Sequence, residues 1–454
     1  MELLRQGDAG FEQACTEPIF NARRPDRRPL AVLRATSEAD VVAGVRLARD
    51  EGLRLAVRSG GHSWAAWSLR EGSLLIDLGE LRELGFDASS GVATASPSIR
   101  GGTELAPFLH RHARAFPAGH CPTVGLGGYL LQGGQGWNSR CWGWACENVV
   151  GVDVVTADGE LLHADETENA DLLWAARGSG PGFFAVITRF HLRTHALPRS
   201  MTHDTWMFEM TELEPLLEWL HELLPRLESV VEPVVAATRL PFADRPGRLL
   251  HTTAVCDSSA EVAKVLEPLD ACPIAGRAIS HARGPTTIAE ENEAQGRQSP
   301  ENHRYAADCT WTDASAAELA PLLRELWTEL PTRHSFSIWY GWSPTRQLPD
   351  MAFSTEGNVY LATYAIWDDP ADDERHSAWC ADHARRLATL GKGVYLGDTD
   401  FTRRSDRFLS DENFRRLQEI RARRDPEGLF CSYLAAPGAE LNADPNRRRR
   451  TREG

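Results

Sequence analysis

The sequence of 454 residues has no apolar stretch of the roughly 18 residues that a membrane-spanning helix needs, which excludes a membrane-spanning protein. Its first residues lack the basic region and apolar core of a secretory signal, so we expect a cytoplasmic location. Acidic residues outnumber basic ones, 64 to 49. The net charge is −15, and the one dense basic run, residues 447–450, is typical of a solvated tail. We therefore expect neither a nucleic-acid partner nor a membrane partner, and the oligomeric state stays open.

Three common kinds of site are also missing. No Gly-x-Ser-x-Gly segment supports a serine hydrolase. No metal site is predicted, because His110 and His112 would point apart on a helix and the spacing of Cys141 and Cys146 is not that of metal ligands. The nine cysteines are scattered singly and are odd in number, which favours reduced and mostly buried thiols over disulfides.

The length and the changing pattern of the chain predict two domains. A chain this long exceeds the size at which a single core stops growing. Short strands and helices follow one another without a repeat up to about residue 196. Beyond it come long helices beside a run of strands, which favours an antiparallel sheet covered on one side. The helices of this second part are expected at 212–227, 316–330 and 372–390, and its strands at 249–255, 335–342 and 359–367.

Two glycine-rich segments stand out in the first part. Residues 58–63 read Arg-Ser-Gly-Gly-His-Ser and follow a predicted buried strand, and residues 119–129 read Gly-His-Cys-Pro-Thr-Val-Gly-Leu-Gly-Gly-Tyr. Each segment sets one nucleophile, His62 or Cys121, among glycines whose backbone N–H groups can approach an anion closely. A phosphate loop explains the glycines alone. A cofactor held by phosphate-binding loops and by two side-chain bonds explains the nucleophiles as well.

A nicotinamide site is disfavoured. Gly125 and Gly127 superficially match the dinucleotide fingerprint, but its third glycine would fall at Leu130, and no βαβ unit with an acidic residue follows at the expected distance. The glycines fit better as two backbone loops that close on a pyrophosphate. Structural turns are the alternative interpretation.

The two motifs, with the order of later segments, resemble the berberine bridge enzyme-like flavoproteins of the vanillyl-alcohol oxidase or p-cresol methylhydroxylase superfamily. In that family the His of the first motif bonds the 8α methyl of FAD, and the Cys of the second bonds ring carbon 6. The resemblance therefore implies FAD attached covalently to both His62 and Cys121. The later matching segments are 148–159, 171–178, 187–190, 365–370 and 424–430.

The resemblance also implies an α+β fold with a two-part FAD-binding domain of the p-cresol methylhydroxylase type. The expected division is 1–196 for the FAD-binding domain, 197–390 for the substrate-binding domain, 391–440 for a segment returning to the FAD domain, and 441–454 for a basic disordered tail. Cofactor contacts are expected from Arg58, Ser59, Gly60, Gly61, His62, Ser63, Cys121, Val124, Gly125, Gly127, Gly128, Tyr129, Gly133, Trp137, Asn138, Asn148, Val149 and Ile187.

The activity implied by the resemblance is that of an oxidase. It would remove a hydride from a CH–OH carbon of a sugar or secondary metabolite and reduce O₂ to H₂O₂. Val124 stands where a small β-branched residue accompanies oxygen reactivity in relatives, which favours an oxidase over a dehydrogenase. Oxidation of a carbon next to nitrogen, or oxidative ring closure, is the alternative on the same fold. A non-catalytic flavin-binding protein is the alternative from another class.

Three phenols are candidates for the catalytic base. The family often uses the Tyr of a Tyr-x-Asn segment, where this chain has Tyr395 but Gly397 in place of the Asn. Tyr340 and Tyr364 lie on predicted strands and are further candidates, with ordinary sheet packing as the alternative. Where other members carry a Glu or Gln on a strand, this chain offers only small residues.

Overall fold

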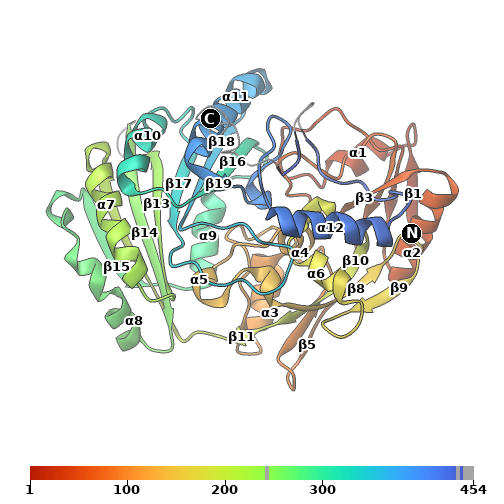
Figure 1. The fold of residues 1–454 in the computed structure, drawn as a ribbon, viewed down its shortest axis with the longest axis horizontal. Coiled ribbons are helices and arrows are strands. Elements are labelled where there is room, and N and C mark those ends of the chain that lie inside the picture. The colour runs from red at the N-terminus through yellow and green to blue at the C-terminus, as the bar shows by residue number, and fades with distance from the viewer. Residues whose placement is uncertain (241–244, 436–439, 443–454) are drawn as a thin grey trace.

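Two sheets organise the first half of the chain in the computed structural model, which describes residues 1–240, 245–435 and 440–442 (Figure 1). The smaller sheet has the order β1-β2-β4-β3, parallel except for the β1–β2 pair, and the larger has the order β5-β6-β10-β8-β9, antiparallel throughout. The strands are β1 Glu2–Arg5, β2 Ala31–Arg34, β3 Arg54–Arg58, β4 Ser73–Asp77, β5 Leu84–Asp87, β6 Val92–Ala95, β8 Val149–Val155, β9 Leu161–Ala164 and β10 Val186–Arg193, with β7 Arg114–Ala115 pairing separately with β11 His195–Ala196.

Short helices connect these strands. The helix expected after Ser37 is present, and the Ser37 hydroxyl accepts the backbone N–H of Asp40 at its N-terminus. Val41 and Val45 are buried on its inner face. The helices are α1 Phe11–Thr16, α2 Glu38–Asp50, α3 Ala106–His110, α4 Leu126–Leu131, α5 Ser139–Trp142 and α6 Ala170–Ala176.

One antiparallel sheet dominates the second half. Its eight strands follow the order β15-β12-β14-β13-β17-β18-β16-β19. Side chains alternate along each strand, so Val231, Val235 and Ala237 of β13 pack under the helices while Val234 and Ala236 face the first half of the chain. The strands are β12 Ser200–Glu209, β13 Val231–Arg239, β14 Pro246–Cys256, β15 Ser280–Pro285, β16 Arg304–Thr312, β17 Phe336–Gly341, β18 Val359–Trp367 and β19 Gly391–Gly393.

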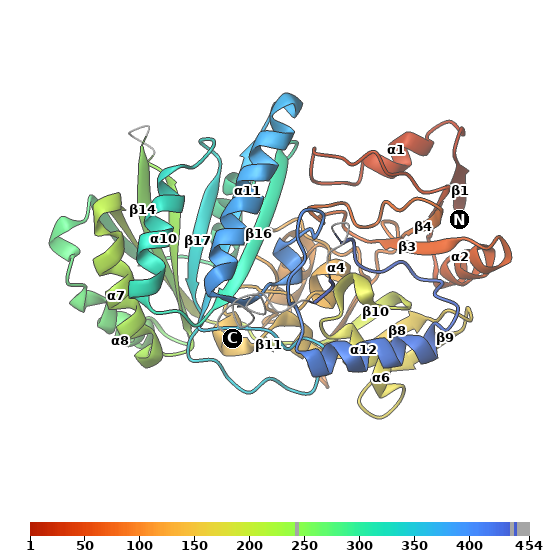
Figure 2. The same cartoon turned by 45° about the horizontal axis from the view of Figure 1, so that its top comes forward.

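Helices cover the outer face of this sheet, as Figure 2 shows for α7, α10 and α11. Helix α9 lies on the opposite face, toward the first half of the chain (Figure 1). The α+β prediction with a helix-covered antiparallel sheet is therefore confirmed. The bounds are α7 Leu213–Leu223, α8 Ser259–Leu266, α9 Ile288–Gln298, α10 Ala316–Thr328 and α11 Asp373–Leu387.

The end of the described chain crosses back to the first half. Helix α12, Asp411–Arg424, runs beside α6, and Leu55 of β3 exchanges backbone hydrogen bonds with Leu429 and Cys431 (Figure 2). Strand β19 still belongs to the large sheet, so the crossing begins a little after residue 391. The predicted tail, 441–454, lies almost wholly outside the described residues. No helix in the described part of the chain combines the length and apolar character of a membrane crossing.

Candidate cofactor and substrate site

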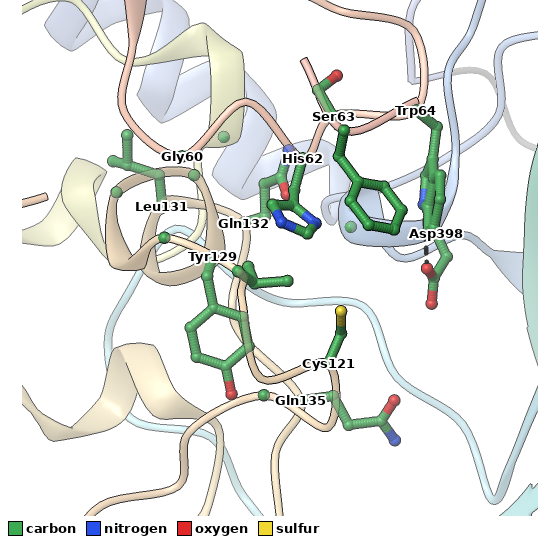
Figure 3. A pocket seen from close by; sticks show the side chains of 18 of the residues that line it. Gly60, His62, Ser63, Trp64, Cys121, Tyr129, Leu131, Gln132, Gln135 and Asp398 are labelled. Atoms are coloured by element: carbon green, nitrogen blue, oxygen red, sulfur yellow. Dashed lines mark hydrogen bonds between the residues drawn. The ribbon is translucent and has the colours of Figure 1, made fainter. Parts of the chain in front are cut away.

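A cavity of about 570 Å³ lies between the two halves, within the size range of cofactor and ligand pockets. Both glycine-rich loops form one side of it, together with the end of β3 and the C-terminal segment. Strands β13, β14 and β17 and helix α9 form the other side. The close view in Figure 3 shows the two loops with His62 and Cys121 turned into the same space.

The two loops touch through glycine backbones. A Cβ atom added to Gly60 would lie 2.6 Å from the amide nitrogen of Gly125, and one added to Gly127 would lie 2.5 Å from Ser59 Oγ. Gly61 has a φ of +72°, and a Cβ there would lie 1.8 Å from the carbonyl oxygen of Pro18. Only glycine allows this approach, so the motifs specify the contact between the loops directly.

Thr123 lies between the two nucleophiles. Its Oγ1 is 3.2 Å from His62 Nε2 and 3.8 Å from Cys121 Sγ. Phe20 stacks on the His62 ring at 4.3 Å between centroids and fixes its plane. Burial, with the charge of Arg100, lowers the pKa of His62 to about 4, so the imidazole is neutral at pH 7. Burial raises the pKa of the Cys121 thiol, and hydrogen bonds from Thr123 partly oppose that rise.

The residues present fit an FAD. Gln135 lines the cavity, and its buried Nε2 has no hydrogen-bond partner among the described residues, so an acceptor supplied by a ligand would satisfy it. A Cβ added to Gly128, on the wall of the same cavity, would meet no atom of the described chain within 4 Å, which leaves open space in front of the loop. At the start of α4 the N–H groups of Leu126 and Gly127 donate to the carbonyls of Ile99 and Pro97, which holds the loop in place beside this space.

Most of the predicted cofactor residues line this cavity. They are Ser59, Gly60, Gly61, His62, Ser63, Cys121, Val124, Gly125, Gly127, Gly128, Tyr129, Trp137 and Ile187. Arg58 also borders it, but its guanidinium points away and donates to Asp77 and to the carbonyls of Ala14 and Cys15. The Arg58 side chain therefore anchors the strand that leads into the loop.

Four other predicted cofactor residues lie outside the cavity: Gly133, Asn138, Asn148 and Val149. The Asn148 amide donates to the carbonyls of Trp142 and Trp144, so it holds a local turn. Asn138 has a φ of +61° and its N–H donates to Glu232. Gly133 has a positive φ and faces aromatic rings, and the Val149 carbonyl accepts from Arg177. Among the described residues, Asn138 Oδ1 is buried without a hydrogen-bond partner, and cofactor contact by these four residues stays a prediction.

The three predicted phenols all line the cavity, but their hydroxyl groups have different hydrogen-bond partners. Tyr340 donates to Glu232 Oε1 at 2.8 Å, and this buried carboxylate also accepts two backbone N–H groups. Tyr395 accepts the N–H of Gly134 at 3.2 Å. Tyr364 donates to Asp398 Oδ2 at 2.8 Å.

Asp398 is the functional candidate that sequence reasoning missed. It lines the cavity and accepts from Tyr360 at 2.5 Å and Tyr364 at 2.8 Å, and the indole of Trp64 donates to its other oxygen at 3.3 Å (Figure 3). Burial raises the pKa of this carboxyl, while the three hydrogen bonds lower it. The only sequence signal was its place directly after the altered Tyr-x-Asn segment.

The hydrogen bond from Tyr340 gives a test of whether this phenol is catalytic. We expect Tyr340→Phe to cost about 1.5–3 kcal/mol of unfolding free energy, because it removes a donor to the buried Glu232 carboxylate. Its kcat should stay within about threefold of wild type, since the hydroxyl is already hydrogen-bonded to Glu232. Urea unfolding and flavin-reduction kinetics measure the two effects. A large fall in kcat at unchanged stability would instead restore Tyr340 as the base.

The opposite wall is mostly apolar. The cavity-facing side of the sheet presents aliphatic, aromatic and small polar side chains, and α9 adds residues spaced along one helical face. Glu291 on α9 is held by His203, His251 and Thr286. The sheet contributes Val234, Ala236, Thr238, Leu249, His251, Phe336, Ile338 and Tyr340, and the helix contributes Glu291, Ala294, Gln295 and Gln298.

Comparison with known proteins agrees with this site. The sequence family described as FAD binding domain matches residues 29–165. The chain is 37% identical to the FAD-linked oxidoreductase janO of Penicillium janthinellum, over 93% of this chain and 95% of that protein. The solved structure of 6-hydroxy-D-nicotine oxidase from Arthrobacter nicotinovorans has a TM-score of 0.82 at 21% identity, covering 96% of this chain and 98% of that one. The BBE-like 1 protein of Physcomitrella patens has a TM-score of 0.82 at 19% identity, covering 96% of each.

Proposed function

The chain belongs to the FAD-linked oxidoreductases of the vanillyl-alcohol oxidase and p-cresol methylhydroxylase superfamily, and from this we propose that it is an oxidase carrying bicovalent FAD. It would oxidise the CH–OH carbon of an uncharged secondary metabolite and pass the electrons to O₂, giving H₂O₂. The observation that supports this most directly is the convergence of His62, Cys121 and Asp398 on one cavity between glycine loops and an apolar sheet.

The loops and the two nucleophiles would hold the cofactor. Backbone N–H groups around Gly60 and Gly125 suit the pyrophosphate, and the neutral His62 imidazole and the Cys121 sulfur, once its thiol loses the proton, suit the electrophilic ring carbons. Each bond replaces a protein N–H or S–H and a flavin C–H. The two electrons and two protons released per bond leave on O₂ as H₂O₂.

Asp398 is placed to take the proton of the substrate hydroxyl. The bound flavin supplies the acceptor for the hydride. Tyr360 and Tyr364 hold the Asp398 carboxylate in place, and the raised pKa brings it closer to the neutral range in which a general base is effective. We assign the base to Asp398 rather than Tyr395, because burial raises the pKa of the Tyr395 phenol and leaves it protonated at pH 7.

The lining of the cavity supports an uncharged and largely apolar substrate. Among the described residues that line it, arginines come only from Arg58 and Arg70, both in the FAD half, and His251 on the sheet wall is paired with Glu291. A substrate carboxylate or phosphate would therefore find no unpaired basic group on the sheet wall. Val234, Leu249 and Ile338 offer aliphatic contact instead. An alcohol on an apolar secondary metabolite suits this wall better than a sugar.

The covalent attachment has a direct test. After acid precipitation of wild-type protein, the flavin should stay in the pellet, and it should also stay in the single variants His62→Ala and Cys121→Ala. Only the double variant should release it, because either bond alone retains the ring. Absorbance of pellet and supernatant, with peptide masses across both loops, measures this. Full release from His62→Ala alone would show that the second bond is absent.

The activity is tested by anaerobic mixing with benzyl alcohol, cinnamyl alcohol, glucose, cellobiose and benzylamine while flavin absorbance is followed. Bleaching by the apolar alcohols, with H₂O₂ released when air is admitted, is the expected result. Bleaching by the sugars alone would indicate a carbohydrate substrate. Bleaching by the amine alone would favour oxidation of a carbon next to nitrogen. If dithionite bleaches the flavin and no substrate does, the protein is a flavin binder without this activity.

A further inference from the structure

Three potential metal ligands meet on the five-stranded sheet, away from the cofactor cavity. Asp153 on β8, His163 on β9 and His191 on β10 each bring one ligand atom within 4.8 Å of the other two. Asp153 pairs directly with His163 across the strands, and His191 pairs with Gly151, which lies on the same face of β8 as Asp153. Three adjacent strands therefore hold the three side chains on a rigid surface.

The side chains are oriented toward one shared point. Asp153 Oδ1 lies 2.6 Å from His163 Nδ1 and 3.2 Å from His191 Nε2. The two imidazole rings are perpendicular, with centroids 5.1 Å apart. Gly151 makes this possible, because a Cβ there would lie 3.2 Å from His163 Cε1 and would crowd the ring. The distances between these nitrogens and the carboxylate oxygen are therefore close to the distances between the ligands of one small metal ion.

The surroundings suit a cation that enters from solvent. His163, His191 and Asp165 line a shallow open hollow, and Asp165 Oδ2 lies 3.7 Å from His163 Nε2, the ring nitrogen that faces away from Asp153. Arg189 is bound to the other carboxylate oxygen of Asp153, Oδ2, so Oδ1 still faces the imidazoles. None of these side chains lines the cofactor cavity, so the oxidase chemistry gives no reason for them to be together.

We propose that Asp153, His163 and His191 form a binding site for a divalent transition-metal ion of the zinc class, with water as the fourth ligand. Two imidazoles and one carboxylate favour Zn²⁺, Ni²⁺ or Cu²⁺ over Mg²⁺ and Ca²⁺, which prefer oxygen alone. Binding displaces the protons shared between Asp153 and the two rings and involves no change of oxidation state. A bound ion would link strands β9 and β10 through β8, which lies between them, and so stabilise the FAD half.

Zinc binding to the full-length holoprotein, freed of any purification tag, tests the proposal. After equilibrium dialysis against ZnCl₂, metal analysis should find one zinc per chain, and zinc should raise the midpoint of thermal unfolding. His163→Gln and His191→Gln should each weaken zinc binding by about tenfold or more, because each removes a ligand from a three-residue set. The flavin spectrum shows whether each variant is folded, and having two variants keeps the test valid if one fails to fold.

The matched control is His110→Gln, a histidine outside the three-residue set, which should bind zinc as wild type does. Wild-type protein that retains no zinc overturns the proposal. So does zinc binding that survives in both His163→Gln and His191→Gln, since the metal would then lie elsewhere. Because the readout is metal content, neither result depends on whether the oxidase activity is found.

Discussion

Replacing Asp398 with asparagine is expected to lower the rate of flavin reduction about a thousandfold, within the range that general base catalysis contributes. The substitution keeps the shape and still accepts hydrogen bonds from Tyr360 and Tyr364, but the amide cannot take the proton of the substrate hydroxyl. Anaerobic stopped-flow with a reactive alcohol measures the reduction step alone. The flavin content should equal that of wild type, because Asp398 is neither of the two residues proposed to tether the flavin.

The pH dependence gives the same assignment a second readout. Burial raises the pKa of Asp398, and the carboxyl must be ionised to accept a proton. The wild-type reduction rate should therefore fall as the pH drops through this raised pKa, and it should level off above it. Asp398→Asn should lose that acidic limb, since the titrating group is gone.

A neighbouring carboxylate provides the control. Asp400 pairs with Arg23 at 3.2 Å and does not line the cavity, so Asp400→Asn should keep kcat and its pH profile near wild type. If Asp398→Asn stays within about threefold of wild type while Tyr395→Phe loses the reduction step, the base is Tyr395 and the assignment to Asp398 is wrong.

The cofactor half of the site was predictable because its constraints are local. Gly60 and Gly125 are required by the backbone contact between two short loops, and glycine in the sequence indicates such a contact directly. The family resemblance then placed His62 and Cys121 on those loops. Asp398 could not be found this way. Its importance comes from Trp64 and from two tyrosines on β18, which only the folded chain brings to it.

The same distinction applies to contacts that the sequence did not predict. The backbone N–H of Asn138 donates to Glu232, which is on a strand that the sequence did not predict, while the Asn148 amide donates to the nearby carbonyl of Trp142. Strand β16 was also missed, because its buried Asp308 interrupts the apolar pattern and is balanced only by the distant Arg404. The histidines of the proposed metal site are far apart in sequence and meet only through strand pairing.

Adding one methyl group at the contact between the two loops is expected to abolish flavin incorporation. In Gly60→Ala the new Cβ would lie 2.6 Å from the amide nitrogen of Gly125, and in Gly125→Ala it would lie 2.8 Å from the Cα of Gly60. Both obstacles are backbone atoms, so the loops must separate, and the two anchors His62 and Cys121 must separate with them. We expect purified protein without yellow colour and without detectable oxidase activity.

Gly276→Ala is the control for this pair, because a Cβ there would meet nothing within 4 Å and the residue is remote from the cavity. It should bind wild-type amounts of flavin. The ratio of absorbance at 450 nm to that at 280 nm measures incorporation, and circular dichroism shows whether the chain is folded. A folded Gly60→Ala variant with full flavin content would mean that the loops can separate without losing the cofactor. The glycines would then be required for turns alone, and the pyrophosphate would have to be held by other backbone groups.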